Sequence, residues 1–313
     1  MLTIDERITG GLWGLLVGDA LGVPYEFHEP HNLPRHAAIE MVPPWGFQRA
    51  HARVAPGTWS DDGAHALILL VSLLACKQLD LDDFGQRMLE WYTNGYMAVD
   101  NDMFDVGIQT THALRALAQG QPAATAGPDH ERANGNGSLM RVLPLALWHR
   151  GSDTELVQDA HTQSLVTHGH SRSQVCCALY CLWARQMLWG NPDPWQHAVH
   201  MLRSIYDRNS PFSVELEQSI CPDNPPEGQG TGYVIDCLHS ARLAVQAGNY
   251  EKVVKAAIAL GHDTDTTACV AGGIAGIRDG MNAIPERWRK QLRGQALFEP
   301  LLQQLLQRHQ DKI

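Results

Sequence analysis

The sequence has few basic residues and no long apolar run. Lys and Arg number 24 against 34 Asp and Glu, which gives a formal net charge of -10, and no cluster of basic residues stands out that could bind a phosphate backbone. The longest apolar run, at residues 66–76, falls well short of the ~20 residues that span a bilayer. The N-terminal segment carries acidic residues where a secretory signal would be basic. We therefore expect a cytoplasmic protein with no nucleic-acid or membrane partner.

Paired cysteine motifs are missing as well. The seven cysteines form no CxxC pair, their number is odd, and three of them, Cys176, Cys177 and Cys181, lie in one apolar stretch. This usage favours buried free thiols in a reducing compartment over a disulfide framework. With 44% hydrophobic and 19% charged residues in 313, the chain has an ordinary globular composition and can bury a large core without such links.

Helical spacing dominates the chain, and alternating β-type runs are almost absent. Residues 36–42 are the best weak candidate for a strand. Helices are predicted at residues 66–79, 173–189, 233–247, 253–260 and 268–277, with one or two closing helices at 285–309. Stretches rich in Pro or Gly at 27–58, 120–136 and 209–232 read as long loops, which often carry binding sites. The pattern predicts an all-α fold in one compact multi-helix domain, residues 1–313, with loops gathered around a site.

An acidic cluster, Ser60-Asp61-Asp62, leads directly into the first long apolar run. Capping explains part of it, because Ser and Asp suit an N-cap and carboxylates are favoured by the helix dipole. One Asp would be enough for that role. Two adjacent carboxylates repel each other unless a cation or a basic group lies near, so a metal site is the functional alternative.

A second acidic cluster, Asp263-Thr264-Asp265-Thr266, also precedes a predicted helix. Asp263 and Asp265 lie two positions apart, so a loop can direct both at one point, and Thr266 adds a hydroxyl. Such oxygen ligands suit Mg²⁺ or Mn²⁺, whereas the twelve-residue spacing of a calcium hand is missing. Because the two clusters together supply four carboxylates and two hydroxyls, we predict a site for two metal ions.

Three further motifs carry weaker signals. The glycines of Asn134–Arg141 precede a predicted helix at 139–150 and could cradle a diphosphate. A glycine-rich turn alone is weak evidence for that role, and a flexible turn is the simpler interpretation. This turn is neither a Walker loop nor a Rossmann turn. The pair His168 and His170 is more typical of a structural or substrate-contacting histidine than of a zinc site. Glu26, in a loop, could act as a gate or in proton transfer.

These segments occur in a recognisable order along the chain. They are Gly18-Asp19-Ala20-Leu21-Gly22 with Glu26, Thr58-Trp59-Ser60-Asp61-Asp62, Asp105-Val106-Gly107 with Thr110, Asn136-Gly137-Ser138-Leu139-Met140-Arg141, Thr167-His168 and Asp263-Thr264-Asp265-Thr266. The set resembles the ADP-ribosylglycohydrolase family, which includes the dinitrogenase reductase-activating glycohydrolases. The likeness covers about residues 8–280. Its acidic motifs are specific in combination, whereas its glycine motifs alone are not.

The resemblance implies an all-helical hydrolase that removes ADP-ribose from modified side chains, often arginine, with two Mg²⁺ or Mn²⁺ ions. The implied metal ligands are Ser60, Asp61, Asp62, Asp263, Asp265 and Thr266. The implied ADP-ribose pocket contains Gly107, Asn136, Gly137, Ser138 and His168. Glu26 would sit beside the metals, and proton transfer would fall to Glu26, Asp61, Asp62 or Asp265. Many relatives have Gly where His262 stands, so we expect this imidazole to touch the metal shell or the pocket rim.

Two other classes of function remain open from the sequence. The pair His262-Asp263, with His65 as a further ligand, is similar to the His-Asp pair of helical metal phosphohydrolases that act on nucleotides. Alternatively, the scaffold could serve without catalysis as an immunity protein that blocks an ADP-ribosylating toxin. A combined role is also open, in which the enzyme reverses the damage that such a toxin causes to a protein substrate.

Overall fold

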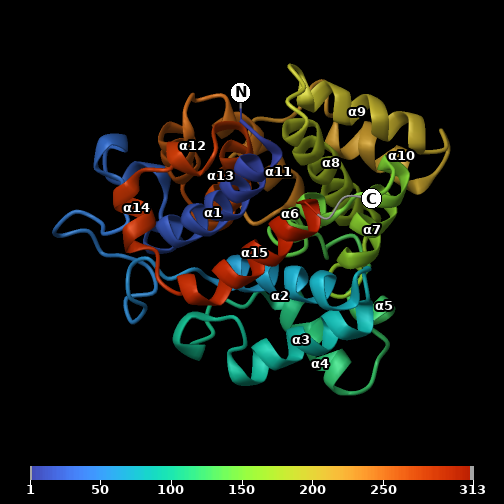
Figure 1. Cartoon of the computed structure of the whole chain (residues 1–313), viewed down its shortest axis with the longest axis horizontal. Coiled ribbons are helices and arrows are strands. Elements are labelled where there is room, and N and C mark those ends of the chain that lie inside the picture. The colour runs from blue at the N-terminus through green and yellow to red at the C-terminus, as the bar shows by residue number, and fades with distance from the viewer. Residues whose placement is uncertain (1, 311–313) are drawn as a thin grey trace.

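The computed structural model describes residues 2–310 and is all-α, as predicted (Figure 1). Within this range the only β-type pairing is an isolated bridge between Gly135 and Tyr233. The α-helices are α1 (Ile4–Gly22), α2 (Asp61–Cys76), α3 (Leu81–Asn94), α4 (Ile108–Ala118), α5 (Ala123–Ala126), α6 (Leu143–Trp148), α7 (Asp153–Ser164), α8 (Ser171–Leu188), α9 (Pro194–Ile205), α10 (Pro211–Val214), α11 (Val234–Val245), α12 (Tyr250–Ile258), α13 (Thr264–Asp279), α14 (Glu286–Gln291) and α15 (Gln295–Gln310). None of the described helices is long and apolar enough to cross a membrane.

The centre of the fold is an antiparallel pair, α1 and α13, in close backbone contact. A side chain at Gly10 would meet the carbonyl oxygen of Gly276 at 2.1 Å, and one at Gly18 would meet that of Ala268 at 2.2 Å. Glycine at these positions therefore allows the two helices to touch. Because the pair is antiparallel, the beginning of α13 lies beside the end of α1, and this places Asp265 next to the turn that follows Gly22.

The beginning of α2 is attached to the same pair by Asp19 of α1. The Ser60 amide donates to Oδ1 of Asp19 at 2.9 Å, and the Gly63 amide donates to Oδ2 at 2.7 Å. These bonds satisfy backbone donors that the first turn of a helix leaves unpaired. Burial raises the pKa of Asp19 to about 7, even though the hydrogen bonds oppose that rise. Asp19 thus fixes the first turn of α2 against α1.

The longer helices agree with the sequence prediction. The predicted helices at 173–189, 233–247 and 253–260 correspond to α8, α11 and α12, and the segment 285–309 holds two helices, α14 and α15. The first and last acidic clusters belong to α2 and α13 themselves, because these helices begin at Asp61 and Thr264, before the predicted starts at 66 and 268. All seven cysteines are free and five are buried, as expected.

Several predictions about local structure were wrong. Residues 36–42 form no strand and contain a 3-10 turn, His36–Ala38. The predicted helix at 139–150 begins only at Leu143, because Pro144 has no N–H with which to continue a helix from Met140. Two predicted loops contain short helices, α5 in the segment 120–136, and α10 with a π-helix, Glu215–Ile220, in the segment 209–232.

The predicted loop 27–58 is held to the helices at Glu40. Its carboxylate accepts from Arg287 and from the Trp288 indole, and it pairs with Lys255 at 3.1 Å. Tyr25 also bonds the Glu40 backbone through both its hydroxyl proton and its oxygen. Although partial burial alone would raise it, these side-chain hydrogen bonds lower the pKa of Glu40 to about 2. These contacts therefore anchor the loop to α12 and α14 through Glu40.

We expect Glu40→Ala to lower the stability of the protein in a pH-dependent way. A carboxyl whose pKa is lower in the folded state stabilises above its ordinary pKa of 4.5, and this contribution is lost as the pH falls towards 2. Because a third of the side chain is exposed, we expect about 1–2 kcal/mol rather than the full value of the shift. Urea unfolding at neutral pH and near the folded-state pKa of about 2 measures the loss of stability. The loss should be smaller at the lower pH, and an equal loss at both would contradict the ionic origin.

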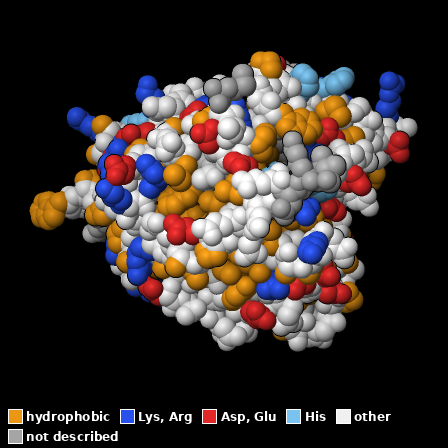
Figure 2. Space-filling view, viewed as in Figure 1, with side chains coloured by type: hydrophobic (Ala, Val, Ile, Leu, Met, Phe, Trp, Pro, Cys, Tyr) orange, Lys and Arg blue, Asp and Glu red, His pale blue; other side chains and the backbone are white. Residues whose placement is uncertain are grey.

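Charges on the surface are mixed. In the space-filling view, Lys and Arg side chains lie scattered among Asp and Glu across the face shown (Figure 2). That face carries no continuous basic patch of the kind that binds a phosphate backbone. A group of carboxylates instead lies buried inside the molecule, near the end of α1 and at the beginnings of α2 and α13.

Candidate active site

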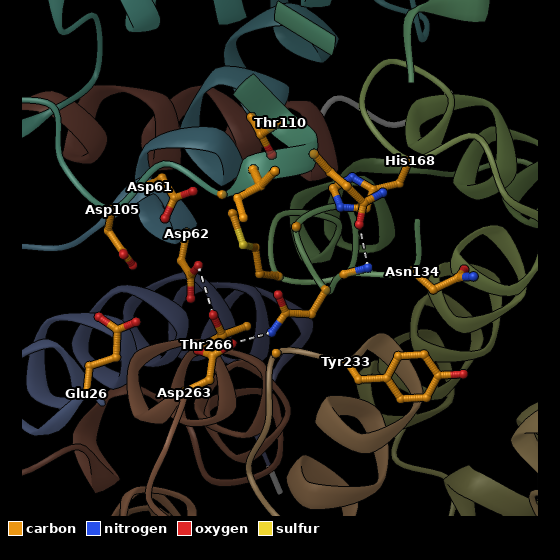
Figure 3. Close-up of a pocket in the computed structure, with 18 of the residues that line it drawn as sticks. Glu26, Asp61, Asp62, Asp105, Thr110, Asn134, His168, Tyr233, Asp263 and Thr266 are labelled. Atoms are coloured by element: carbon orange, nitrogen blue, oxygen red, sulfur yellow. Dashed lines mark hydrogen bonds between the residues drawn. The ribbon is translucent and has the colours of Figure 1, made fainter. Parts of the chain in front are cut away.

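A cavity of about 530 Å³ opens where the predicted loops meet the beginnings of α2 and α13 (Figure 3). Its walls carry acidic, amide and glycine residues: Glu26, Asp61, Asp62, Asp105, Gly107, Ile108, Gln109, Thr110, Arg132, Asn134, Gly135, Asn136, Gly137, Met140, His168, Gly232, Tyr233, Asp263 and Thr266. Backbone pairing closes the loops around it, since the Asn136 amide donates to the Gly232 carbonyl and the Phe27 amide to the His262 carbonyl. Two of the three predicted loops line the cavity, 120–136 and 209–232, whereas 27–58 supplies no wall residue and approaches the site through His51, which contacts Glu26.

The two acidic clusters meet in this cavity although they lie about two hundred residues apart. The Thr266 hydroxyl donates to Oδ1 of Asp62 at 3.3 Å across a separation of 204 residues. Asp61 and Asp62 stand in the first turn of α2, and Asp263 is the N-cap of α13 with Asp265 in its first turn. Both helix starts therefore point their carboxylates at the same volume, as Figure 3 shows for Asp61, Asp62 and Asp263.

Within residues 2–310, the buried carboxylates of Asp61, Asp62 and Asp265 form no ion pair. Oδ2 of Asp62 and Oδ2 of Asp265 are buried without a hydrogen-bond partner among the described residues. Burial, and after it the neighbouring carboxylates, raise the pKa of Asp61, Asp62 and Asp265 well above the ordinary value. Ligand atoms of Asp19, Asp62 and Asp265 lie within 4.8 Å of one another, as do those of Glu26, Asp263 and Asp265. A divalent cation with a preference for oxygen fits these groups, because it would supply the missing charge.

Ser60 has a second role that is visible in the structure. Its hydroxyl accepts from the Asp62 amide at 3.2 Å and so caps α2. The capping interpretation of the sequence is thus correct for Ser60, while the buried, unpaired carboxylates that follow it exceed what a cap needs. A ligand role for Ser60 stays a prediction.

Glu26 lies beside the clusters, and a histidine that the sequence did not single out binds it. Nε2 of His51 lies 2.6 Å from Oε2 of Glu26 and 3.8 Å from Oδ1 of Asp105. Burial, followed by Asp105, Asp263 and nearby carboxylates, raises the pKa of Glu26 to about 11. Burial also raises the pKa of Asp105 to about 6. Glu26, His51 and Asp105 thus form a group of titratable side chains beside the two acidic clusters.

The opposite wall is built from the Asn136 turn. Nδ2 of Asn136 donates to Oδ2 of Asp263 at 2.8 Å, which connects this turn to α13. A Cβ on Gly137 would lie 2.8 Å from Cε1 of His168, so the glycine lets the imidazole approach the backbone. The turn does not stand at a helix N-terminus, since α6 begins at Leu143. The helix start expected directly behind this turn is therefore wrong, whereas the turn does line the cavity and its binding of a diphosphate stays a prediction.

The other residues of the predicted pocket divide into lining and supporting positions. Gly107, Asn136, Gly137 and His168 line the cavity, whereas Ser138 is fully buried and outside the lining. Its Oγ accepts from the Ser164 hydroxyl at 2.9 Å, behind the turn. His168 and His170 do not form a paired metal site, because His170 caps α8 and lies 3.5 Å from Glu131.

His262 does not reach the predicted metal ligands. Its Nε2 lies 3.8 Å from Glu29, and the residue is not part of the cavity wall. Its backbone bonds Phe27 and His28 on the loop that follows Glu26. The residue has a φ of 57°, in the left-handed region that favours glycine. The glycine expected at this position is thus explained by backbone shape, and the expectation of a contact with the metal shell was wrong.

We expect His262→Gly to be more stable than His262→Ala by about 1–2 kcal/mol, because only glycine adopts the left-handed conformation without strain. Hydrolytic activity should be retained in both variants, since the side chain lies outside the cavity. Thermal unfolding of the two purified variants gives the comparison. If His262→Ala is as stable as His262→Gly, the backbone strain is absent. Loss of activity in His262→Gly would show that the imidazole takes part in the site.

The sequence missed three residues of this site. Asp19 and Asp105 lie in the sequence motifs but are not among the predicted site residues, and His51 lies outside those motifs. A single acidic residue on a helix of small residues has no distinctive spacing, and His51 reaches Glu26 only because the loop folds back. The positive φ of His51 and of Asp105 marks unusual backbone at both places, which no residue type in the sequence indicated.

An all-helical fold whose carboxylates meet beside a glycine-lined cavity is that of an ADP-ribosylglycohydrolase. The chain belongs to this family, whose sequence model matches residues 1–312. Membership makes the protein an ADP-ribosyl hydrolase, and confirms the resemblance on which the ligand assignments were made. It does not by itself fix the residue from which ADP-ribose is removed.

The chain is similar over nearly its whole length to characterised relatives. It is 29% identical to the ADP-ribosylarginine hydrolase Tri1 of Pseudomonas putida, over 97% of this chain and 78% of the relative. It is 25% identical to the ADP-ribosyl-[dinitrogen reductase] glycohydrolase of Rhodospirillum rubrum, over 93% and 91%. A solved structure, an ADP-ribosylglycohydrolase-related protein complex, superposes with a TM-score of 0.77 at 31% identity and covers 97% and 98% of the two chains.

Proposed function

We propose that the protein is a metal-dependent hydrolase that releases ADP-ribose from modified arginine side chains. The observation that carries the proposal is the meeting of two carboxylate clusters. Asp61, Asp62 and Asp263 line one cavity, and buried oxygens of Asp62 and Asp265 have no partner among the described residues. A relative that acts on ADP-ribosylarginine is similar over almost the whole chain. Together they favour an N-glycosidic bond as the one that is broken.

Two Mg²⁺ or Mn²⁺ ions are proposed to bind at the beginnings of α2 and α13. The proposed ligands are the hydroxyls of Ser60 and Thr266 and the carboxylates of Asp61, Asp62, Asp263 and Asp265. Bound divalent ions would polarise ribose oxygens and lower the pKa of a water molecule. Asn136, through its bond to Asp263, keeps one of these carboxylates in a fixed orientation. Asp19 does the same for the whole first turn of α2.

The other wall is proposed to bind the ADP-ribose. Gly107 leaves its backbone open to the ligand, whereas the space beside Gly137 is filled by the imidazole edge of His168. Ser138 would act from behind, by holding the turn through Ser164. At the mouth of the cavity, Asp105 leaves 23% of its side chain exposed, and this carboxylate suits the positive guanidinium of an arginine.

Hydrolysis requires one proton to be moved for each bond broken. The bond between C1″ of the ribose and the guanidine nitrogen breaks, the hydroxyl of a water molecule joins C1″, and the proton of that water goes to the leaving nitrogen. Positive charge develops at the ribose in between. Glu26, whose carboxyl is bonded to His51, is the proposed carrier of the proton. Asp61, Asp62 and Asp265 are the alternatives, although each is also a proposed ligand.

The other classes of function gain less support. A phosphohydrolase site would need His65 and His262 beside the carboxylates, but His65 is buried edge-on against Trp91 with ring centroids 4.2 Å apart, and His262 lies near Glu29. A binding protein without catalysis would not need two unpaired buried carboxylates. A role against an ADP-ribosylating toxin stays a prediction, and protection that survives Asp265→Ala would favour binding over hydrolysis.

The type of linkage is tested with two peptides, one ADP-ribosylated on arginine and one on serine, incubated with and without Mg²⁺. We expect free ADP-ribose from the arginine peptide, only with Mg²⁺, and at least ten times more slowly from the serine peptide. A preference for the serine peptide would overturn the arginine assignment and leave the hydrolase intact. Release from neither peptide would contradict the proposed function itself.

A further inference from the structure

Behind the cavity wall, a fully buried arginine makes three hydrogen bonds to neutral groups. Arg141 is 0% exposed. Its Nε and Nη2 donate to the side-chain and backbone oxygens of Gln163, and its Nη1 donates to Oγ1 of Thr167 at 2.6 Å. A guanidinium has five donors and no acceptor. The direction of the bond to Thr167 is therefore certain, and the hydroxyl oxygen must accept.

Because its oxygen already accepts from Arg141, Thr167 also restricts the protonation of the next residue, His168. Its Oγ1 lies 2.8 Å from Nδ1 of His168, and both residues are buried. If Nδ1 of His168 carried a proton, the Thr167 oxygen would accept twice and its own hydroxyl proton would be left without a partner. A buried donor without a partner costs about 1–3 kcal/mol. The favoured arrangement has the Thr167 hydroxyl donating to an unprotonated Nδ1.

We propose that Arg141 and Thr167 form a positioning relay that fixes the tautomer of His168, so that its Nε2–H is a hydrogen-bond donor to an oxygen of the ligand in the cavity. The imidazole is neutral in this arrangement, with its proton on the nitrogen that faces the Gly135–Gly137 turn. Burial, followed by the charge of Arg141, lowers the pKa of His168 to about 3, which agrees with a neutral ring.

The geometry of the turn shows where this donor is directed. Substituted Cβ atoms at Gly135 and Gly137 would lie 3.4 and 3.3 Å from Nε2 of His168. The same turn fixes a second donor, because the Gly135 amide donates to Oε1 of Gln109 at 2.7 Å and leaves the buried Nε2 of Gln109 without a partner. Figure 3 shows His168 beside this turn at the cavity wall. Two donors around one turn suit a ligand that offers oxygen acceptors, such as a phosphate or a ribose hydroxyl.

The other tautomer would have the opposite effect. With its proton on Nδ1, His168 would present a lone pair to the cavity and repel a phosphate oxygen. The relay therefore determines whether Nε2 of His168 donates or accepts a hydrogen bond in the cavity, although Arg141 and Thr167 themselves do not line it. The identity of the ligand oxygen rests on the proposed function, whereas the tautomer of His168 does not.

The tautomer is measured directly in protein labelled with ¹⁵N-histidine, by two-bond ¹H–¹⁵N correlation spectra. The signals of His168 are assigned by their loss in His168→Gln. The wild-type ring is expected to show a protonated Nε2 and an unprotonated Nδ1 without any ligand present. A protonated Nδ1, or a doubly protonated ring at neutral pH, would overturn the proposal whether or not the protein proves to be a hydrolase.

Two substitutions separate the relay from simple packing. Thr167→Val keeps the shape and removes the hydroxyl, so we expect a mixture of tautomers and an affinity for free ADP-ribose about tenfold weaker, by calorimetry. Thr167→Ser is the matched control and is expected to restore both properties. An unchanged Nε2–H tautomer and affinity in Thr167→Val would contradict the relay. If Thr167→Val does not fold, the wild-type spectrum still decides. No affinity for ADP-ribose in the wild type would count against the proposed function and not against the tautomer.

Discussion

Asp265→Ala is expected to keep the helical fold and to lose ADP-ribose release by at least about 1,000-fold, because a bound divalent cation is worth several kcal/mol of transition-state stabilisation and each 1.36 kcal/mol is a factor of ten. Asp265 is 0% exposed, and one of its oxygens has no partner among the described residues. Circular dichroism measures the fold, and the rate of release measures the activity. Asp61→Ala is expected to behave in the same way.

Thermal unfolding adds a second measure of the same substitution. Mg²⁺ should raise the melting temperature of the wild type, since a ligand that binds only the folded state stabilises it, and this rise should vanish in Asp265→Ala. In EDTA the variant should be at least as stable as the wild type, because one of several buried like charges is gone. The matched control is Asp82→Ala, an exposed Asp in the first turn of α3. Full turnover by Asp265→Ala would end the metal assignment.

Asp19→Asn is expected to destabilise the protein by about 1–3 kcal/mol and to reduce activity as well. Both carboxylate oxygens of Asp19 accept from backbone amides at the start of α2. An amide side chain can replace only one of these acceptors, so its NH₂ group faces the N–H of Ser60 or Gly63 and leaves a buried donor unpaired, at about 1–3 kcal/mol. The shift of the first turn then moves Asp61 and Asp62 away from the second cluster.

Urea unfolding in EDTA gives the loss of stability without a contribution from metal binding. Asp82→Asn serves as the control for the same chemical change at an exposed position, and its effect should be within about 0.5 kcal/mol. An Asp19→Asn protein as stable as the wild type would show that the two backbone bonds to Asp19 do not hold α2. Normal activity with lowered stability would show that Asp19 anchors α2 without being needed to position Asp61 and Asp62 for catalysis.

The parts of the site that could be predicted from the sequence are those with a local pattern. Two adjacent carboxylates before an apolar helix, and two carboxylates two positions apart before a small-residue helix, stand out within a few residues. Their meeting across the fold could not be derived from spacing, because it depends on the antiparallel contact of α1 with α13 at Gly10, Gly18 and their partners. The family resemblance supplied that step.

The parts that sequence reasoning missed depend on contacts between distant segments. Asp19 reads as one acidic residue on a helix of small residues, and its function is visible only in the amides of Ser60 and Gly63. His51 reaches Glu26 by a loop that reverses direction, with a positive φ at His51 itself. Apolar spacing predicts a helix at 139–150. Pro144 outweighs that spacing, because it has no N–H with which to continue a helix from Met140.

The account as a whole depends on a divalent ion at the two helix starts acting on an ADP-ribosyl bond. Mass spectrometry of an arginine-ADP-ribosylated protein, incubated with the wild type or with Asp265→Ala, in Mg²⁺ or in EDTA, tests this most directly. The prediction is loss of the ADP-ribosyl group and release of free ADP-ribose only with the wild type in Mg²⁺. Equal removal in EDTA, or by Asp265→Ala, would contradict it.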